Sequence, residues 1–186
     1  MKNKKNRKSD KNTESNQGMK VDKYGTLVIT NKKLLKRLMQ TSFNKQSEAD
    51  NYRVTVVCET PESELLALKR HKRKSFGKHW GGQGGRVDAG ETLKYAAQRE
   101  SDEETGYFPK DITPAMLEIT KKGRLTLTFI AHCKEKFKPD LDNEHTKPKW
   151  VDGPDNWPKR RHPTINNLIK FVMKSEKEYS RKKPPD

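Results

Sequence analysis

The pattern of apolar and polar positions predicts strands that alternate with helices, which indicates an α/β or α+β fold. Apolar residues at 34–39 have nearly helical spacing and follow Asn31, a residue type suited to begin a helix. Residues 165–173 repeat apolar side chains at the spacing of an amphipathic helix. Strands are expected where β-branched, aromatic or alternating apolar residues cluster, at 24–30, 53–59, 64–69, 124–133 and 150–151.

These elements divide the chain into four expected parts. Residues 1–20 contain seven basic and two acidic residues and no aromatic residue, so they bury too little apolar surface to fold and form a disordered basic tail. Residues 21–50 form an N-terminal extension with a short strand and a helix, and 41–51 form a polar linker. The main domain spans 51–178, and 179–186 form a second basic tail.

Composition changes this picture in three ways. The 186 residues carry a formal charge of +16, which favours polyanionic partners such as nucleotides or nucleic acid. No run approaches the ~20 apolar residues of a membrane span, and no secretory signal opens the chain, so we expect a soluble, cytoplasmic protein without a membrane partner. Cys58 and Cys133 lack a CxxC partner, which argues against structural zinc and favours two buried free thiols.

An acidic helix is the most informative element. Its expected ends are Thr92 and Gly106, and its apolar residues share one face with three glutamates, within an arc of about 120°: Leu93, Ala96, Ala97, Glu100, Glu103 and Glu104. The opposite, solvent-facing side is expected to hold Lys94, Gln98, Ser101, Asp102 and Thr105. Inward carboxylates repel one another unless cations neutralise them. A divalent cation site or a structural salt-bridge cluster would both satisfy this pattern, and the preceding glycine-rich turn at 81–90 favours the cation.

The region from 85 to 107 resembles the Nudix box, the signature of the Nudix hydrolases. Gly85 is followed after five residues by Glu91, and after seven more by Arg99-Glu100-Ser101-Asp102-Glu103-Glu104-Thr105-Gly106-Tyr107. Two positions depart from the usual pattern. Ser101 replaces an aliphatic residue, at what we expect to be a modest stability cost on the solvent side, and Gln83 replaces a common proline. The resemblance extends over roughly 52–178.

The resemblance implies a Nudix-type α/β/α sandwich with a mixed β-sheet and a hydrolase that uses Mg²⁺ (or Mn²⁺). It assigns Glu100, Glu103 and Glu104 as catalytic metal ligands, helped by the carbonyl of Gly84. Arg99 and Glu91 would pair to hold the loop against the helix. The general base in this family is a box glutamate or an acidic residue of a later loop, where Glu144 is our candidate; a solvated acidic loop is the alternative.

A basic run at 69–78 precedes the box. Its candidate substrate-binding residues are Lys69, Arg70, Lys78 and Trp80, although a solvated loop and a packed tryptophan explain the same residues. The expected partner is a nucleotide, and the reaction is cleavage of the pyrophosphate linkage of a (d)NTP, a dinucleoside polyphosphate or a nucleotide sugar. The alternatives are an RNA 5′-end hydrolase that uses the basic tails and the 69–78 loop, and a Nudix-fold binding module without catalysis.

Overall fold

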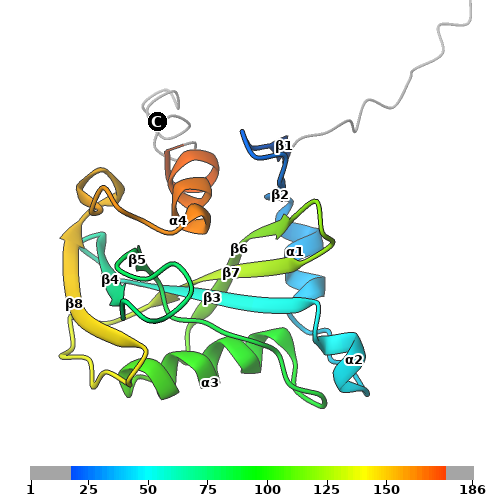
Figure 1. Cartoon of the computed structure of the whole chain (residues 1–186), viewed down its shortest axis with the longest axis horizontal. Helices are drawn as coiled ribbons and strands as arrows, with labels where there is room; N and C mark the ends of the chain where they lie inside the picture. Colours follow the sequence, from blue (N-terminus) through cyan, green and yellow to red (C-terminus); the bar gives the residue numbers. More distant parts are fainter. Residues whose placement is uncertain (1–17, 175–186) are drawn as a thin grey trace, which may run out of the picture.

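A mixed eight-stranded sheet lies at the centre of the structure, a computed structural model that describes residues 18–174 (Figure 1). The strands follow the order β1-β2-β6-β7-β3-β4-β5, and β8 pairs with β4. β3 and β7 run parallel, while the other strand pairings within 18–174 are antiparallel. The strands are β1 (Met19–Val21), β2 (Leu27–Ile29), β3 (Tyr52–Glu59), β4 (Glu64–Arg70), β5 (Trp80–Gly81), β6 (Ile112–Ile119), β7 (Leu125–His132) and β8 (His145–Asp152).

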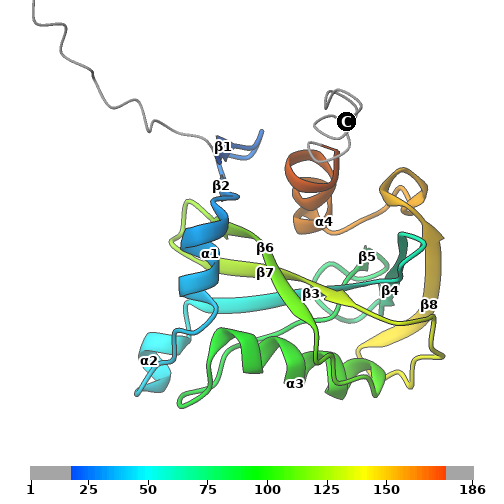
Figure 2. The ribbon, with the colours of Figure 1, turned by 180° about the vertical axis from the view of Figure 1, so that it is seen from behind.

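Helices cover both faces of this sheet. One face packs against α1 (Lys32–Leu38), α2 (Gln46–Ala49) and α3 (Leu93–Thr105). The other face packs against α4 (Pro163–Leu168) and the π-helical turn η2 (Ile169–Met173), preceded by the short helix η1 (Pro154–Asn156). Seen from behind, α4 and α3 lie on opposite sides of the strands (Figure 2). The α/β/α sandwich with a mixed sheet is therefore confirmed.

Side-chain alternation along the central strands produces the two cores. In β3, Val56 and Cys58 contribute to the core beneath α3, whereas Val57 contributes to the core beneath α4. β4 repeats this arrangement with Leu66 on the α3 side and Leu65 on the α4 side. Strands buried on both faces have near-continuous apolar sequences, as β3 and β4 do. Cys58 and Cys133 are buried free thiols, as predicted.

Several local predictions differ from the structure. The linker expected at 41–51 contains α2 and packs Phe43 and Ala49 into the core. Residues 19 and 20, assigned to the tail, pair with β2 as part of β1. β6 was not predicted, because Pro114 interrupts its apolar pattern; this proline lies beside a register shift in the pairing with β7.

The remaining terminal predictions concern residues outside the described range. The tail residues 1–17 and the tail at 179–186 both lie beyond residues 18–174. Within those residues, every helix is too short or too polar to cross a membrane.

Candidate functional site

The acidic helix α3 begins and ends as its sequence predicts. Thr92 caps its first turn, because its Oγ1 accepts a hydrogen bond from the Tyr95 N–H at 3.1 Å. Gly106 ends it in the left-handed conformation, with φ of 70°, and donates its N–H to the Asp102 carbonyl at 2.7 Å. Because these two caps set the ends of the helix, they place the glutamates in its last two turns.

The glutamates of α3 differ in burial. Glu104 is only 5% exposed, and the Glu100 side chain is 13% exposed. The Glu103 side chain is 57% exposed, so the prediction that this residue faces inward is wrong. Burial raises the pKa of both Glu100 and Glu104, and that of Glu104 rises to about 9. The helix therefore presents two partly desolvated carboxylates beside one that remains in solvent.

The predicted solvent-facing side of α3 is also partly wrong. Ser101 and Thr105 are buried, and both bond to the segment that follows the helix. The Ser101 hydroxyl donates to the Tyr107 carbonyl at 2.9 Å, and the Asp140 N–H donates to the Thr105 carbonyl at 2.9 Å. Ser101 thus makes a buried hydrogen bond that an aliphatic residue could not make, and the expected stability cost on the solvent side does not apply.

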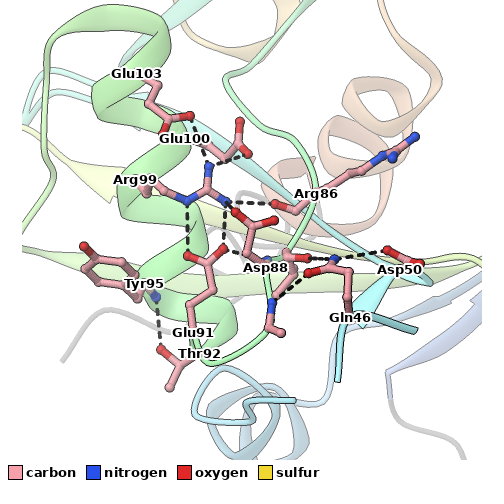
Figure 3. Close-up of polar contacts among 12 residues, drawn as sticks. Gln46, Asp50, Arg86, Asp88, Glu91, Thr92, Tyr95, Arg99, Glu100 and Glu103 are labelled. Atoms are coloured by element: carbon pink, nitrogen blue, oxygen red, sulfur yellow. Dashed lines mark hydrogen bonds and ion pairs between the residues drawn. The ribbon is translucent and has the colours of Figure 1, made fainter. Parts of the chain in front are cut away.

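Arg99 connects the glutamates to the loop that precedes the helix (Figure 3). Its guanidinium donates to both carboxylate oxygens of Glu91, at 2.7 and 3.1 Å, and to Glu100 at 2.9 Å. It also pairs with the exposed Glu103 at 3.1 Å and donates to the Arg86 carbonyl at 3.0 Å. The bidentate pair with Glu91 is the main reason that the pKa of Arg99 is raised. This guanidinium orients three carboxylates at once.

The glycine-rich loop lies against both β3 and the buried glutamates. The Gly84 N–H donates to Glu104 Oε2 at 2.9 Å, and the Gly85 carbonyl accepts from the Val54 N–H at 3.0 Å. A Cβ atom on Gly85 would lie within 2.5 Å of the Glu100 carboxylate, so a side chain there would displace this glutamate. Close approach of backbone and carboxylate therefore requires glycine at this position.

The same loop is held by two residues that sequence analysis did not treat as part of the site. Gln46 of α2 accepts a hydrogen bond from the Ala89 N–H at 3.0 Å and donates to the Val87 carbonyl at 3.2 Å (Figure 3). Gln83 is fully buried, and its backbone exchanges hydrogen bonds with Val56 of β3 at 2.8 and 3.0 Å. A proline at 83 would lack the N–H for one of these bonds.

A second segment brings further ligand-type side chains to Glu104. One oxygen of Glu104, one oxygen of Asp142 and one ring nitrogen of His145 lie within 4.8 Å of one another. Asp142 Oδ1 lies 3.0 Å from His145 Nδ1 and accepts the backbone N–H groups of Glu144 and His145. Burial lowers the pKa of His145, which favours the neutral imidazole. The sequence pointed to Glu144 in this loop and not to Asp142 or His145. The pattern that could have indicated them is an acidic residue three positions before a histidine that begins a strand.

Glu144 itself has a different environment. It pairs with Lys74 at 2.7 Å and with Arg70 at 3.0 Å. The hydrogen bond from Lys74 is the largest cause of its lowered pKa. A carboxylate stabilised in this way is a weaker proton acceptor than a free one.

The other candidate substrate-binding residues lie around β4 and β5. Arg70 lines a cleft beside the glycine loop, while Lys78 is exposed on the loop between these strands. Trp80 is half-buried against the α4-side core, and Lys69 Nζ lies 5.8 Å from the centre of its ring. The structure thus brings Arg70 to the cleft and places Trp80 in packing contacts.

This cleft has a volume of about 740 Å³. Its lining includes residues 81–85 and four arginines: Arg53, Arg70, Arg124 and Arg161. Burial lowers the pKa of Arg53, and the positive charges of Arg124, Arg86 and Arg70 lower it further. At another part of the lining, the Asn167 amide donates to Asp22 at 2.9 Å and to Glu118 at 2.7 Å. Such a cleft can hold an anionic ligand of small-molecule size next to buried carboxylates.

Known proteins resemble this chain in sequence and fold. A family model described as the NUDIX domain matches residues 50–171. A Caenorhabditis elegans protein whose name places it among the nudix hydrolases is 30% identical over 95 residues, which are 50% of this chain and 26% of that protein. This chain therefore spans about a quarter of that relative's length.

Two solved structures illustrate the likeness in fold. A C. elegans Ap4A hydrolase complex superposes with a TM-score of 0.54 at 19% identity, over 69% of this chain and 98% of that one. The M. smegmatis Nudix hydrolase RenU superposes with a TM-score of 0.52 at 18% identity, over 73% of this chain and 88% of that one.

Proposed function

Because the chain belongs to the Nudix family, we propose that it is a Mg²⁺- (or Mn²⁺-) dependent hydrolase of small nucleoside diphosphate-linked substrates. The substrate would be a (d)NTP, a dinucleoside polyphosphate or a nucleotide sugar, cleaved at its pyrophosphate linkage. The observation that carries this proposal is the placement of the two buried glutamates, Glu100 and Glu104, beside glycines that line an arginine-rich cleft. Positive side chains suit the phosphates, and carboxylates suit the cation that accompanies them.

The residues present fit a hard divalent cation. Glu100, Glu103 and Glu104 of α3 would supply oxygen ligands, and the Gly84 carbonyl of the glycine-rich loop would add another. Burial disfavours the ionised forms of Glu100 and Glu104, and a cation held between them would offset this penalty. When bound, the cation would neutralise phosphate charge and lower the pKa of a coordinated water.

The protein's own groups would bind and orient the substrate. Arg99 and Glu91 keep α3 and the glycine loop in fixed relation, and Arg70 is placed to bind a phosphate from the cleft lining. Because its carboxylate is paired with two cations, we assign Glu144 to positioning Arg70 and Lys74 and assign proton acceptance to the glutamates of the box.

The size of the cleft favours a small substrate. About 740 Å³ is within the range of ligand pockets for small molecules. Asp22, Glu118 and Asn167 offer hydrogen-bonding groups that suit a nucleobase or sugar. In this arrangement Lys69, Lys78 and Trp80 would contact the substrate only from outside the cleft lining.

An RNA 5′ end is the second candidate substrate, and one observation favours it. Lys72, Arg73 and Lys78 are exposed on the loop whose residues Ser75 and Phe76 line the cleft. A chain that continued out of the cleft would meet these charges. The basic tail would add to this attraction, so deletion of residues 1–20 should weaken turnover of RNA and spare mononucleotides; equal losses on both would contradict this alternative.

The test is a screen of products released with Mg²⁺. It compares (d)NTPs, diadenosine tetraphosphate, ADP-ribose and 5′-triphosphorylated RNA at low and moderate salt. The proposal expects turnover of one small nucleotide with little salt dependence. Preference for RNA with steep salt dependence would select the alternative, and inactivity on every substrate would favour a binding module, although Glu100, Glu103 and Glu104 are all present.

A further inference from the structure

His145 is a buried histidine whose hydrogen bonding is incomplete. It is the first residue of β8, it is 5% exposed, and its side chain contacts no solvent. Nδ1 lies 3.0 Å from Asp142 Oδ1, but Nε2 is buried and has no hydrogen-bond partner among residues 18–174. Buried polar atoms without a partner are uncommon in folded proteins and call for an explanation.

Neither neutral tautomer of His145 removes the difficulty. With the proton on Nδ1, the imidazole donates to Asp142, and the lone pair of Nε2 stays buried without a donor. With the proton on Nε2, that N–H is buried without an acceptor, and the lone pair of Nδ1 faces a carboxylate oxygen at 3.0 Å. A cation bound through Nε2 satisfies both ring nitrogens, because the proton then stays on Nδ1 and is donated to Asp142. Histidines that bind a metal through one nitrogen commonly donate the other N–H to a carboxylate in this way.

Building on the proposed metal-dependent hydrolase, we propose that Glu104 and His145 form a cation position, with Asp142 holding the imidazole, that selects a transition-metal ion such as Mn²⁺ over Mg²⁺. One carboxylate oxygen each of Glu104 and Asp142 and one ring nitrogen of His145 lie within 4.8 Å of one another. Mg²⁺ prefers oxygen ligands in an octahedral arrangement, whereas imidazole nitrogen favours transition-metal ions. The resemblance to the Nudix box supplies Glu104; Asp142 and His145 are contributed by the segment before and at the start of β8.

The surrounding structure holds these ligands in place. Glu104 Oε2 accepts the Gly84 N–H, which leaves its other oxygen for a cation. Asp142 Oδ1 accepts two backbone N–H groups, which fixes this carboxylate before His145. The pairing of β4 with β8 shifts register between Lys69 and Arg70, opposite the start of β8, and irregularities of this kind redirect side chains at sheet edges.

The positive charge that faces this cluster is partly compensated. Arg70 influences both Glu104 and His145 electrostatically, but its guanidinium is paired with Glu144 at 3.0 Å. Glu104 and Asp142 supply two negative charges when ionised, so the cluster retains an attraction for a divalent ion.

Electron paramagnetic resonance of bound Mn²⁺ tests this assignment directly. The full chain is freed of metal, loaded with one equivalent of Mn²⁺ without substrate, and examined for the echo modulation produced by imidazole nitrogen. We expect this modulation in the wild type and its loss in His145→Gln, with Mn²⁺ binding weakened about tenfold or more. Mg²⁺ binding, measured by competition, should weaken far less.

His132→Gln is the matched control. It removes a histidine that is exposed at the end of β7 and that contacts Thr113 at 3.0 Å, away from the proposed ligands. The nitrogen modulation and the Mn²⁺ affinity of this variant should equal those of the wild type.

The wild-type spectrum alone can overturn the proposal, even if His145→Gln fails to fold. Bound Mn²⁺ without imidazole modulation, or modulation that persists in a folded His145→Gln variant, would exclude His145 as a ligand. Asp142→Asn provides a second folded-state test and should also weaken Mn²⁺ binding. Because no substrate is present, failure of the hydrolase proposal would appear separately, as Mn²⁺ bound through nitrogen without turnover of any nucleotide.

Discussion

Replacement of the buried glutamate, Glu104→Gln, should stabilise the metal-free protein while removing most of the proposed hydrolytic activity. Glu104 is 5% exposed, and burial raises its pKa to about 9. At pH 7.5 the folded metal-free protein therefore keeps a proton on this carboxyl that the unfolded chain has lost. Glutamine has nearly the same volume, still accepts the Gly84 N–H, and requires no proton.

The magnitude follows from the difference in protonation. A glutamate in the unfolded chain has an ordinary pKa of 4.5. For each pH unit between this value and pH 7.5, the folded wild type loses about 1.4 kcal/mol of stability, which gives an upper limit of about 4 kcal/mol. Desolvation of the glutamine amide offsets part of this gain, so we expect about 2 kcal/mol of net stabilisation. For a chain of this length, that corresponds to a rise in Tm of about 4–8 °C.

Thermal unfolding after removal of divalent cations measures this effect. Because the folded-state pKa is raised, the stability of the metal-free wild type should fall as pH rises from about 4.5 to about 9. The difference between variant and wild type should therefore be large at pH 7.5 and small near pH 5. Glu103→Gln, at an exposed side chain, should show no such gain and serves as the control.

Three results would refute this reasoning. The first is a Glu104→Gln variant that is less stable than the metal-free wild type at pH 7.5. The second is a stability difference that does not shrink toward pH 5. The third is near-normal turnover by the folded variant, which would remove Glu104 from the metal ligands.

Three further perturbations follow from contacts of the site. If Mg²⁺ raises the Tm of the wild type, as the proposed function expects, Gly85→Ala should displace the Glu100 carboxylate and abolish this rise, whereas Gly81→Ala, whose Cβ would meet nothing closer than 3.8 Å, should retain it. Arg99→Lys should lose the bidentate ion pair with Glu91 and about 2 kcal/mol of unfolding free energy in urea; equal stability would contradict a stabilising role for this pair. His162 lines the cleft just before α4, and burial lowers its pKa to about 4. Wild-type stability should therefore drop as pH falls from about 6.5 to 4, by up to about 3 kcal/mol, and His162→Asn should flatten this dependence in a pH series of denaturant melts.

The features that sequence predicted correctly depend on local chemistry. Thr92 and Gly106 end α3 because a hydroxyl and a left-handed glycine satisfy backbone groups within a few residues of themselves. β3 and β4 were predicted because strands buried on both faces require apolar residues throughout. The family resemblance came from the same local region, so the fold and the acidic helix could both be predicted from the chain alone.

The features that sequence missed depend on contacts between distant segments. The rotation of α3 about its axis was predicted from its own residues, yet Ser101 is buried and bonds to the Tyr107 carbonyl, while Glu103 stays in solvent. Asp142 and His145 meet Glu104 only because β8 pairs with β4 and brings its first residue to the helix. The hydrophobic periodicity of a single helix or strand cannot predict such contacts between distant segments.

The pairing of β2 with β6 has a consequence for how this protein can be shortened. The family match begins at residue 50, but β2 occupies the β6 edge through residues 27–29, and Asp22, Tyr24 and Thr26 line the cleft. A protein truncated to the matched region would expose the backbone hydrogen-bonding groups of β6, and open strand edges of this kind recruit other chains into aggregates. The unit to express in bacteria, crystallise or graft into another enzyme therefore starts before the first strand and not at the boundary of the family match.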